Sequence, residues 1–390
     1  MGDFMLKNKL QYMMSNNPEE TLSDKGSKRR KKIRPFFLTI LKFSNKLKLI
    51  VEKNEFKKIN RPIIYVASHG FKDDVLNTLL TIKDDAYVVF GNIDLFYNTF
   101  DGLCLWIYGT QLVNRYDKIS KHAMKNKMDR IIELGNNVII FSEATWNLSP
   151  NKPMENLHGG FYDVALKNNA LIVPVLTHKV GKKCYSRVLK PIDLKEINIE
   201  DIKLIYITMK KYIDKAYDLV IYNDAPSSEA KKIIFNLKKI IEQLSICTTM
   251  EEIKKQIDYI EMICDQSANQ INKLKLNVNK NEELEISAFN LVSKLIFRAG
   301  MSKKEIMVTK VRDIMALEKY DMYKKNPDYS YMKNNKNMYE AWEDYLKDTI
   351  SATPYFYPDP EATTLFKDPL IKDEKEVMPW LNKQQKIKKI

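Results

Sequence analysis

Cysteine is scarce in this chain, and the four that occur lie far apart. Cys104, Cys184, Cys247 and Cys264 show no Cys-x-x-Cys spacing among the 390 residues. A small scaffold held by disulfides and a zinc site of the usual spacing are therefore excluded. We expect the four thiols to be reduced, as in a cytoplasmic protein.

Long apolar runs are also lacking. No stretch of about 18 uncharged apolar residues is present, which excludes a membrane-spanning helix. No apolar core follows the first residues, so we expect no secretory signal. Myristoylation of Gly2 favours Ser or Thr at position 6, but this position holds Leu6, so we expect no lipid anchor at Gly2.

Helix-breaking residues are missing from the second half of the chain. No glycine lies between Gly181 and Gly300, and 195–300 contains one proline. Periodic apolar positions predict helices over 199–221, 228–246, 250–277 and 282–299. Thr249 and Glu252 have the spacing of a capping box, and Gly300 is expected to end the last helix. We expect an α-helical docking or packing module over 195–300.

Positive charge is concentrated near the amino terminus. The chain has a net charge of +14, and residues 25–61 hold 14 basic and two acidic residues, a net +12. The pattern predicts an amphipathic helix over 35–51, which would suit an anionic lipid surface. A solvated charge run beside an ordinary core helix is the alternative. Nucleic acid is disfavoured because no nucleic-acid-binding motif accompanies the charge.

These patterns divide the chain into five parts. Residues 1–24 are polar and expected to be disordered, and 25–61 form the basic membrane-facing segment. Residues 62–194 alternate strands and helices, which predicts a catalytic domain of the α/β class with a sheet covered on both faces. The helical module 195–300 follows. Residues 301–390 are expected to pack on the catalytic domain. The strands are expected at 63–67, 86–90, 138–142 and 171–176, with a helix at 119–134.

One stretch concentrates chemistry. The apolar strand 63–67 leads to a turn with His69, and a helix is expected to begin near Asp73 and Asp74. The carboxyl end of such a strand is where open α/β sheets hold ligands. A carboxylate five residues after His69 can hold the imidazole, and a neutral histidine held this way can take a proton from a hydroxyl. A capped helix start with a partly buried histidine is the structural alternative.

Three later stretches carry further candidates. In Gly109–Arg115 a glycine turn and a short apolar run precede an arginine that can bind a phosphate. In Phe141–Trp146 a strand ends in Glu143, Thr145 and Trp146, and this carboxylate could accept hydrogen bonds from a polyol. Pro174 interrupts a third apolar strand. Each candidate has a structural alternative. Arg115 could form a surface ion pair, Glu143 could be a helix N-terminal carboxylate, and Pro174 could mark an edge strand.

Together and in this order, the stretches resemble the glycerolipid acyltransferases. That family has an HxxxxD block, a G-x-[IV]-F-[IV]-x-R block, an F-P-E-G-T-R block and a V-P-[VI] strand. Here they stand as His69–Asp74, Gly109–Arg115, Phe141–Trp146 and Val173–Val175. Gly159-Gly160 with Ala165-Leu166 resembles the family's linking helix, and Val188–Asp193 its last strand. The resemblance covers about 35–194 and not the helical module.

The resemblance implies a fold and a reaction. The implied fold is a mixed α/β sheet flanked by helices, with the α-helical module added. The implied reaction moves an acyl group from a thioester to the hydroxyl of a lysophospholipid or glycerol-phosphate, with His69 as base and Asp74 orienting it. Gly109, Arg115, Glu143, Thr145 and Trp146 would bind the acceptor. No metal and no bound cofactor is implied, and acyl-CoA or acyl-carrier protein would be the co-substrate.

The departures from the family pattern bear on the acceptor. The third block has Ser, Ala and Trp146 where the family has Pro, Gly and Arg, so one phosphate-binding cation is missing. Lys152 or Lys179 could replace it from another position. We expect a cytoplasmic enzyme attached peripherally to anionic membranes. A catalytically weak membrane scaffold of the same fold remains the alternative function.

Overall fold

The computed structural model describes residues 15–57, 59–71, 73–91, 100–114, 117–144, 146–147, 153–198, 228–244 and 283–326, with short stretches between 201 and 263. Two compact units divide the chain. The sheet unit contains residues 15–195 and 308–326, and the helical unit contains the described residues from 196 to 307. The expectations for 1–14 and for 327–390 lie outside the described residues.

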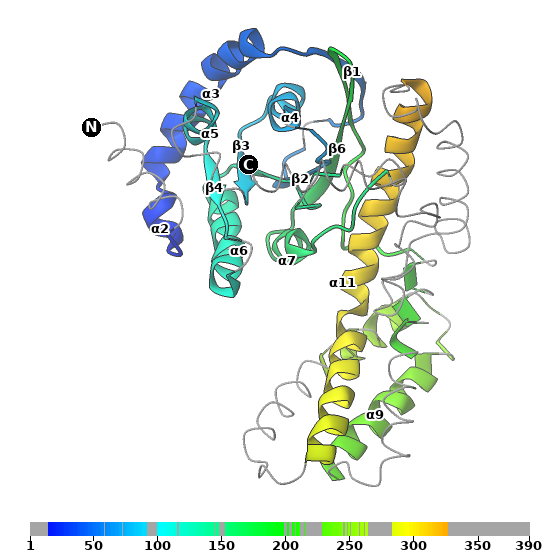
Figure 1. The fold of residues 1–390 in the computed structure, drawn as a ribbon. Coiled ribbons are helices and arrows are strands. Elements are labelled where there is room, and N and C mark those ends of the chain that lie inside the picture. The colour runs from blue at the N-terminus through cyan, green and yellow to red at the C-terminus, as the bar shows by residue number, and fades with distance from the viewer. Residues whose placement is uncertain are drawn as a thin grey trace. The chain divides into compact units, whose positions relative to one another are not determined.

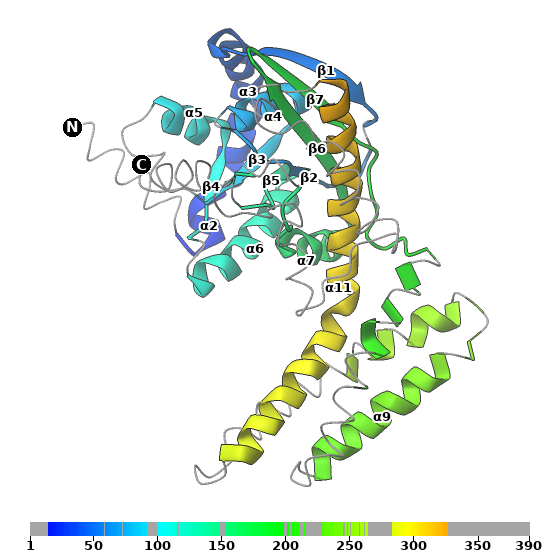
Figure 2. The ribbon, with the colours of Figure 1, turned by 45° about the vertical axis from the view of Figure 1, so that its right-hand side comes forward.

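Seven strands form one mixed sheet in the order β1-β7-β6-β2-β5-β3-β4 (Figures 1 and 2). Their bounds are Lys48–Asn54, Ile63–Ala67, Ala86–Phe90, Thr110–Leu112, Asn137–Ile140, Leu171–Val180 and Lys183–Val188 for β1 to β7. Strands β2 to β6 pair in parallel, whereas β7 runs antiparallel to β6 and parallel to β1. The predicted class, a mixed α/β sheet flanked by helices, is confirmed.

The central strands lie where their apolar runs predict them. Every residue of β2 and β3 is buried, because a strand covered on both faces can be apolar throughout. Both have the predicted bounds, and β5 and β6 differ from prediction only at their ends. The last strand is misplaced: β7 ends at Val188, and Ile192 makes only an isolated bridge to Ile172. Pro191 between them has no N–H for a continuing ladder.

Helices cover both faces of the sheet (Figures 1 and 2). Helices α3, α4 and α5 lie on one face, and α6 and α7 on the other. Their bounds are Asp24–Ser44, Asp74–Ile82, Phe100–Tyr108, Lys118–Glu133 and Gly160–Lys167. Phe37 of α3 and Leu79 of α4 join Ile63 and Tyr65 of β2 in one buried cluster. Helix α6 agrees with the predicted helix 119–134 to within one residue at each end.

The amino-terminal segment differs from expectation. Helix α3 begins at Asp24, where the Ser23 side chain accepts a hydrogen bond from Gly26 N–H, and it continues through Pro35 to Ser44. The predicted helix 35–51 is therefore wrong at both ends. Residues 48–54 form β1 because they pair with β7 along the sheet edge, which overrides their amphipathic pattern. Part of the expected disordered tail is also ordered, since Pro18–Thr21 forms α2 and Leu22 is buried.

The helical unit agrees with the sequence in part. Helix α9, Ser228–Leu244, has nearly the predicted bounds. Thr249 and Glu252 exchange the two hydrogen bonds of the predicted capping box, at 3.2 and 3.3 Å. Helix α11 runs from Glu283 to Lys325, so the expected stop at Gly300 is wrong. One interior glycine costs a helix only about 1 kcal/mol, and no proline follows it within α11 to end the helix. Most of 199–221 and 264–277 lies outside the described residues.

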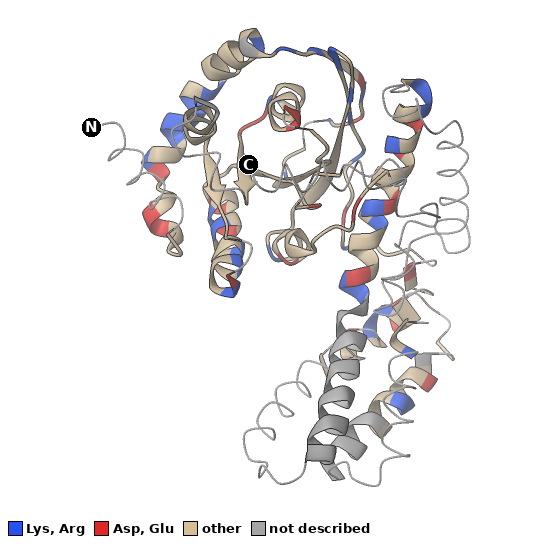
Figure 3. Ribbon diagram, viewed as in Figure 1, with Lys and Arg blue, Asp and Glu red and all other residues tan. Residues whose placement is uncertain are grey.

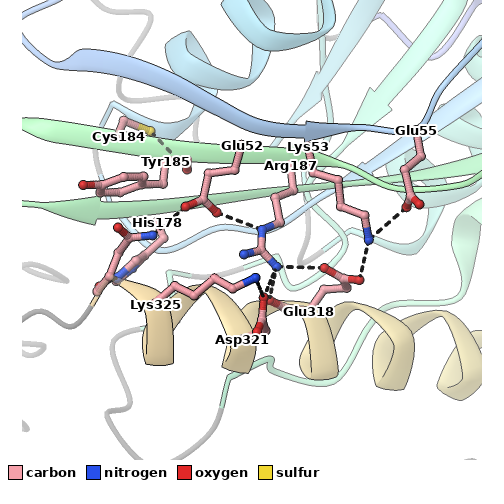
Figure 4. Close-up of polar contacts among 11 residues, drawn as sticks. Glu52, Lys53, Glu55, His178, Cys184, Tyr185, Arg187, Glu318, Asp321 and Lys325 are labelled. Carbon is pink, nitrogen blue, oxygen red and sulfur yellow. Dashed lines mark hydrogen bonds and ion pairs between the residues drawn. The ribbon is translucent and has the colours of Figure 1, made fainter.

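The last part of α11, residues 308–325, belongs to the sheet unit. There Arg187 of β7 lies among carboxylates of two other elements (Figure 4). Its guanidinium is 2.9 Å from Glu52 of β1 and 2.9 and 2.6 Å from Glu318 and Asp321 of α11. Lys53 of β1 also binds Glu318, at 2.8 Å. We call Glu52, Lys53, Arg187, Glu318 and Asp321 the α11 ion cluster.

Candidate active site

The turn between β2 and α4 brings the predicted histidine and aspartate together. His69 Nδ1 lies 2.9 Å from Asp74 Oδ2. The same oxygen accepts hydrogen bonds from Gly70 N–H at 2.7 Å and Phe71 N–H at 3.1 Å. Asp74 is fully buried at the first turn of α4. Its carboxylate therefore holds both the backbone of the turn and the imidazole.

This geometry selects one tautomer of His69. A carboxylate at Nδ1 accepts that N–H, which leaves Nε2 with a lone pair. The His69 side chain is 14% exposed, so the ring is fixed but not sealed from solvent. Asp73 is the N-cap residue of α4 and makes no side-chain capping bond. The pair that can perform proton transfer is thus His69 with Asp74.

Glu143 lies beside His69 because of the strand register. β2 pairs with β5 so that Val66 is opposite Ile140, and three further residues on each chain bring His69 opposite Glu143. Glu143 Oε1 accepts a hydrogen bond from His69 N–H at 2.8 Å, and Oε2 accepts one from Glu155 N–H at 2.8 Å. Burial raises the pKa of Glu143 to about 7, although Lys319, both N–H groups and His69 oppose the rise.

The position of Glu143 does not fit the role that the sequence predicts for it. A direct contact with hydroxyls of the acceptor was predicted, but both carboxylate oxygens are taken by backbone N–H groups and the residue is 3% exposed. The carboxylate therefore holds the turn that carries His69. The sequence signal for this was the strand register, which becomes readable only once the pairing of β2 with β5 is known.

Two aromatic rings border the imidazole. The Phe141 ring centroid lies 4.9 Å from that of His69, and the Trp146 ring lies 6.0 Å away in an edge-to-face arrangement. Trp146 is only partly buried. The third block therefore places an indole beside His69, where the family pattern has an arginine. Thr145 lies outside the described residues.

The second block does not meet the rest of the site in the described residues. Gly109 has a φ of +112°, and a Cβ there would lie 2.9 Å from Arg34 Nη2 and 3.0 Å from Tyr87 Cε1. The glycine is required by this turn before β4, and the expected contact with an acceptor has no support here. Arg115 lies outside the described residues, as does Lys152. Lys179, the other substitute cation, is exposed at the end of β6.

Sequence reasoning missed Lys319 of α11. Its Nζ donates to Thr177 O of β6 at 2.6 Å and to Ser68 Oγ at 3.2 Å. Ser68 immediately precedes His69. A lysine 250 residues away from His69, in a helix without a recognisable motif, gave no sequence signal.

The cysteines and acidic residues add no further chemical site in the part of the chain that is described. Cys104, Cys184 and Cys247 are free thiols there, and Cys264 lies outside it. No group of three or more His, Cys, Asp or Glu side chains is placed to hold a metal ion within the same residues. None of the described helices is long and apolar enough to cross a membrane.

A family model described as "Acyltransferase" covers the strand β2, the His69–Asp74 turn and Glu143. Residues 48–178 match the acyltransferase family. This acyltransferase segment is 131 of the 390 residues, about a third of the chain. It ends before β7 and does not include α11.

Several solved chains are similar to this one. One of these structures is the crystal structure of PlsC, the 1-acyl-sn-glycerophosphate (LPA) acyltransferase from Thermotoga maritima. The similarity covers 63% of this chain and 100% of that chain, with 15% sequence identity and a TM-score of 0.34. No curated protein sequence is significantly similar to this chain. The assignment of the fold rests on the strand order and pairing of the sheet.

Proposed function

We propose that this protein transfers a fatty acyl group from an acyl thioester to a hydroxyl of a lysophospholipid or glycerol-phosphate acceptor. The supporting observation is the His69–Asp74 pair, held at 2.9 Å at the end of β2 inside the acyltransferase segment. Its Nδ1 is fixed by a buried carboxylate, and its Nε2 is left to act as a base.

The reaction needs one proton acceptor. His69 Nε2 takes the proton of the acceptor hydroxyl while the oxygen of that hydroxyl attacks the carbonyl carbon of the thioester. The tetrahedral intermediate then expels the thiolate, which takes the proton from the imidazolium. Asp74 stabilises the imidazolium in between, as the carboxylate does in hydrolase triads. General base catalysis of this kind is worth roughly 10²–10⁴-fold.

No acyl-enzyme intermediate is required. Ser68 is next to His69, but its Oγ is 3.1 Å from Thr177 N–H and 3.2 Å from Lys319 Nζ. It is 1% exposed and lies outside any Gly-x-Ser-x-Gly elbow. A hydroxyl that accepts two hydrogen bonds in the interior is a poor nucleophile, so direct transfer to the acceptor is the simpler route.

Trp146 bears on the choice of acceptor. A phosphate monoester carries more negative charge than a phosphodiester, and the indole offers one N–H donor where an arginine would offer five. We therefore favour lysophospholipids with a larger head group, whose alcohol would lie against the ring. A cationic head group would gain roughly 0.5–2 kcal/mol from the ring face. Trp146→Arg should raise kcat/KM for lysophosphatidate relative to choline and ethanolamine lysolipids; an unchanged ratio would show that Trp146 does not read the head group.

A substrate screen tests the reaction itself. The purified protein is incubated with one acyl-CoA or one acyl-carrier protein and a panel of lysolipids, and the products are identified by mass spectrometry. The proposal predicts acylated lysolipid from at least one pair. Thioester that is neither consumed nor transferred with any pair would contradict it and favour the scaffold function.

Membrane attachment is a second part of the proposal. Beside its buried face, α3 carries four exposed apolar side chains at helical spacing: Ile33, Phe36, Ile40 and Phe43. Phe36 is 69% and Phe43 86% exposed. Exposed basic residues lie on the same helix (Figure 3), and they include Lys25, Lys28, Arg29 and Lys32. An apolar stripe beside cations suits an anionic membrane surface, with peripheral attachment.

Point variants test the attachment better than truncation does. Deleting 25–51 would remove Phe37 and Leu41 from the buried cluster as well. We expect Phe36→Ser/Phe43→Ser to weaken co-sedimentation with anionic vesicles, while Phe235→Ser, at a half-exposed position of α9, has no effect. Binding should also fall with salt, since the Debye length is about 10 Å at 0.1 M. Equal binding by the double variant would place the attachment elsewhere.

A further inference from the structure

Lys319 is a buried lysine that the proposed mechanism does not use. It lies on α11, outside the acyltransferase segment, and is 5% exposed. Its Nζ donates to Thr177 O at 2.6 Å and to Ser68 Oγ at 3.2 Å, and lies 5.8 Å from the Tyr323 ring centroid. Burying an ammonium group is costly unless opposite charge compensates it.

We propose that Lys319 is a positioning residue of the active site, which compensates the buried charges of Glu143 and Asp74 and fixes the turn that carries His69. The proposal rests on the proposed function of His69 as base. The proposal adds Lys319 of α11 to the active site. None of the family's sequence blocks includes this residue.

Asp74, Glu143 and Ser68 fix the position of His69, and Lys319 interacts with each of them. Asp74 holds the ring, and Glu143 holds the backbone N–H. Ser68, one residue earlier, is held by Lys319 Nζ and by Thr177 N–H at 3.1 Å. Because the lysine charge also acts on Asp74 and Glu143, one cation supports all three.

The titratable groups near Lys319 come from four parts of the chain. Asp74 lies on α4, Glu143 follows β5 and Cys184 lies on β7, and each acts on the lysine. On α11 itself, Glu318 is turned toward Lys53 and Arg187 instead. Burial lowers the pKa of Lys319, and Glu143, Asp74 and Cys184 oppose this. Burial also raises the pKa of the Cys184 thiol to about 12, so this thiol is neutral near pH 7.

Two carboxylates therefore act electrostatically on one lysine. Asp74 Oδ1 has no hydrogen-bond partner among the described residues, which leaves part of its charge to be compensated by Lys319. Glu143 needs the same charge, because burial raises its pKa to about 7 even with Lys319 present. Without the cation, the neutral form of Glu143 would persist to higher pH.

A neutral Glu143 would hold His69 less well. One of its oxygens would carry a proton, although both oxygens now accept backbone N–H groups. In the wild type, kcat/KM should rise with pH through about 7 as Glu143 ionises. In Lys319→Met the pKa of Glu143 should be about one pH unit higher or more, since an opposite charge typically shifts a carboxyl pKa by about 1–3 units.

The experiment follows Glu143 directly. The carboxyl resonance of Glu143, assigned by its loss in Glu143→Gln, is titrated by carbon-13 NMR in the full-length protein. We expect a higher pKa in Lys319→Met and a pKa close to wild type in Lys319→Arg and in Lys324→Met, an exposed lysine of the same helix. The pH profile of kcat/KM should shift in parallel. An unchanged Glu143 titration in Lys319→Met would overturn the proposal.

Loss of folding in Lys319→Met would still be informative. If the variant is unstable because it leaves a buried carboxylate uncompensated, the double variant Lys319→Met/Glu143→Gln should have a higher melting temperature than Lys319→Met alone. A double variant that is no more stable, or that fails to fold, would contradict the charge compensation. A wild type that transfers no acyl group would refute the proposed function and not this pairing, because the NMR titration needs no substrate.

Discussion

At the scale of single residues, the turn after β5 is under backbone strain. Ala144 has a φ of +55°, which lies in the left-handed region, and its N–H bonds Phe141 O at 2.9 Å. That conformation costs an L-residue roughly 1–2 kcal/mol, whereas glycine adopts it freely. The glycine of the family's third block fits this requirement, and alanine here does not.

Replacing this alanine should therefore stabilise the protein. Ala144→Gly should raise the free energy of unfolding by about 0.5–1 kcal/mol, because the relief of strain exceeds the greater chain entropy of glycine. Denaturant unfolding at neutral pH measures the change. Ala165→Gly, at a buried position of helix α7, is the control and should destabilise. Destabilisation by both substitutions would show that the turn is not strained.

Proximity in sequence decided which site residues could be predicted. His69 and Asp74 are five residues apart across one strand-to-helix turn, so local spacing was sufficient to pair them. Glu143 was identified, but its role depends on the register between β2 and β5, which spacing does not give. Lys319 comes from a different part of the chain and carries no motif, so only the packing of α11 shows it.

At the scale of elements, the α11 ion cluster holds α11 to the sheet edge (Figure 4). Arg187 is nearly buried and faces Glu52, Glu318 and Asp321. Burial alone would raise the pKa of Glu318, but hydrogen bonds from Lys53 and Arg187 lower it. A carboxyl with a lowered pKa stabilises the fold above its usual pKa, and that stability is lost as pH falls through the lowered value. The attachment of α11 should therefore weaken in acid, below about pH 4.

Removal of the central guanidinium should loosen this element. Arg187→Met leaves three carboxylates facing one another and should lower the free energy of unfolding by about 1–3 kcal/mol, less than for a fully buried pair because the carboxylates are partly exposed. Thermal unfolding measures it. Arg130→Met, at a more exposed arginine paired with Glu19 and Glu133, should change stability by less than about 1 kcal/mol. Equal effects would show that the cluster does not hold α11.

Strands could be predicted where the apolar residues formed a continuous run. The strands β2 and β3 are unbroken apolar runs and have their predicted bounds. Two predictions failed, one because of tertiary pairing and one because of local sequence. Residues 48–54 pair with β7 instead of extending a helix, and α11 continues through Gly300 because the sequence after it favours a helix. Pairing across 135 residues cannot be read from a local pattern.

At the scale of the whole molecule, the acyltransferase segment is smaller than the unit in which it folds. The sheet unit adds α3, β7 and residues 308–326 to it. These parts supply Phe37 to the buried cluster, Arg187 to the ion cluster and Lys319 to the active site. Net charge and composition indicated a basic segment and a helical module. The expectation that 301–390 would pack on the catalytic domain did not identify which residues make the contact.

This return makes a prediction about truncation. A chain that ends at Lys195 keeps the whole acyltransferase segment but loses 308–326, and so leaves Arg187 and Thr177 without their partners on α11. We expect a lower melting temperature and at least about tenfold lower acyl transfer than in the full chain, because the turn at His69 loses Lys319. Full stability and activity of the truncated chain would show that α11 is dispensable.

The measurement that tests the central claim most directly is acyl transfer by His69→Ala. With the donor and acceptor found in the screen, kcat/KM should fall by at least about 10²-fold while circular dichroism and melting temperature stay close to wild type. Asp74→Asn should also be severely impaired, and Asp73→Asn, whose carboxylate does not hold the ring, should be much milder. Wild-type kcat/KM in a folded His69→Ala protein would contradict the assignment of His69 as the catalytic base.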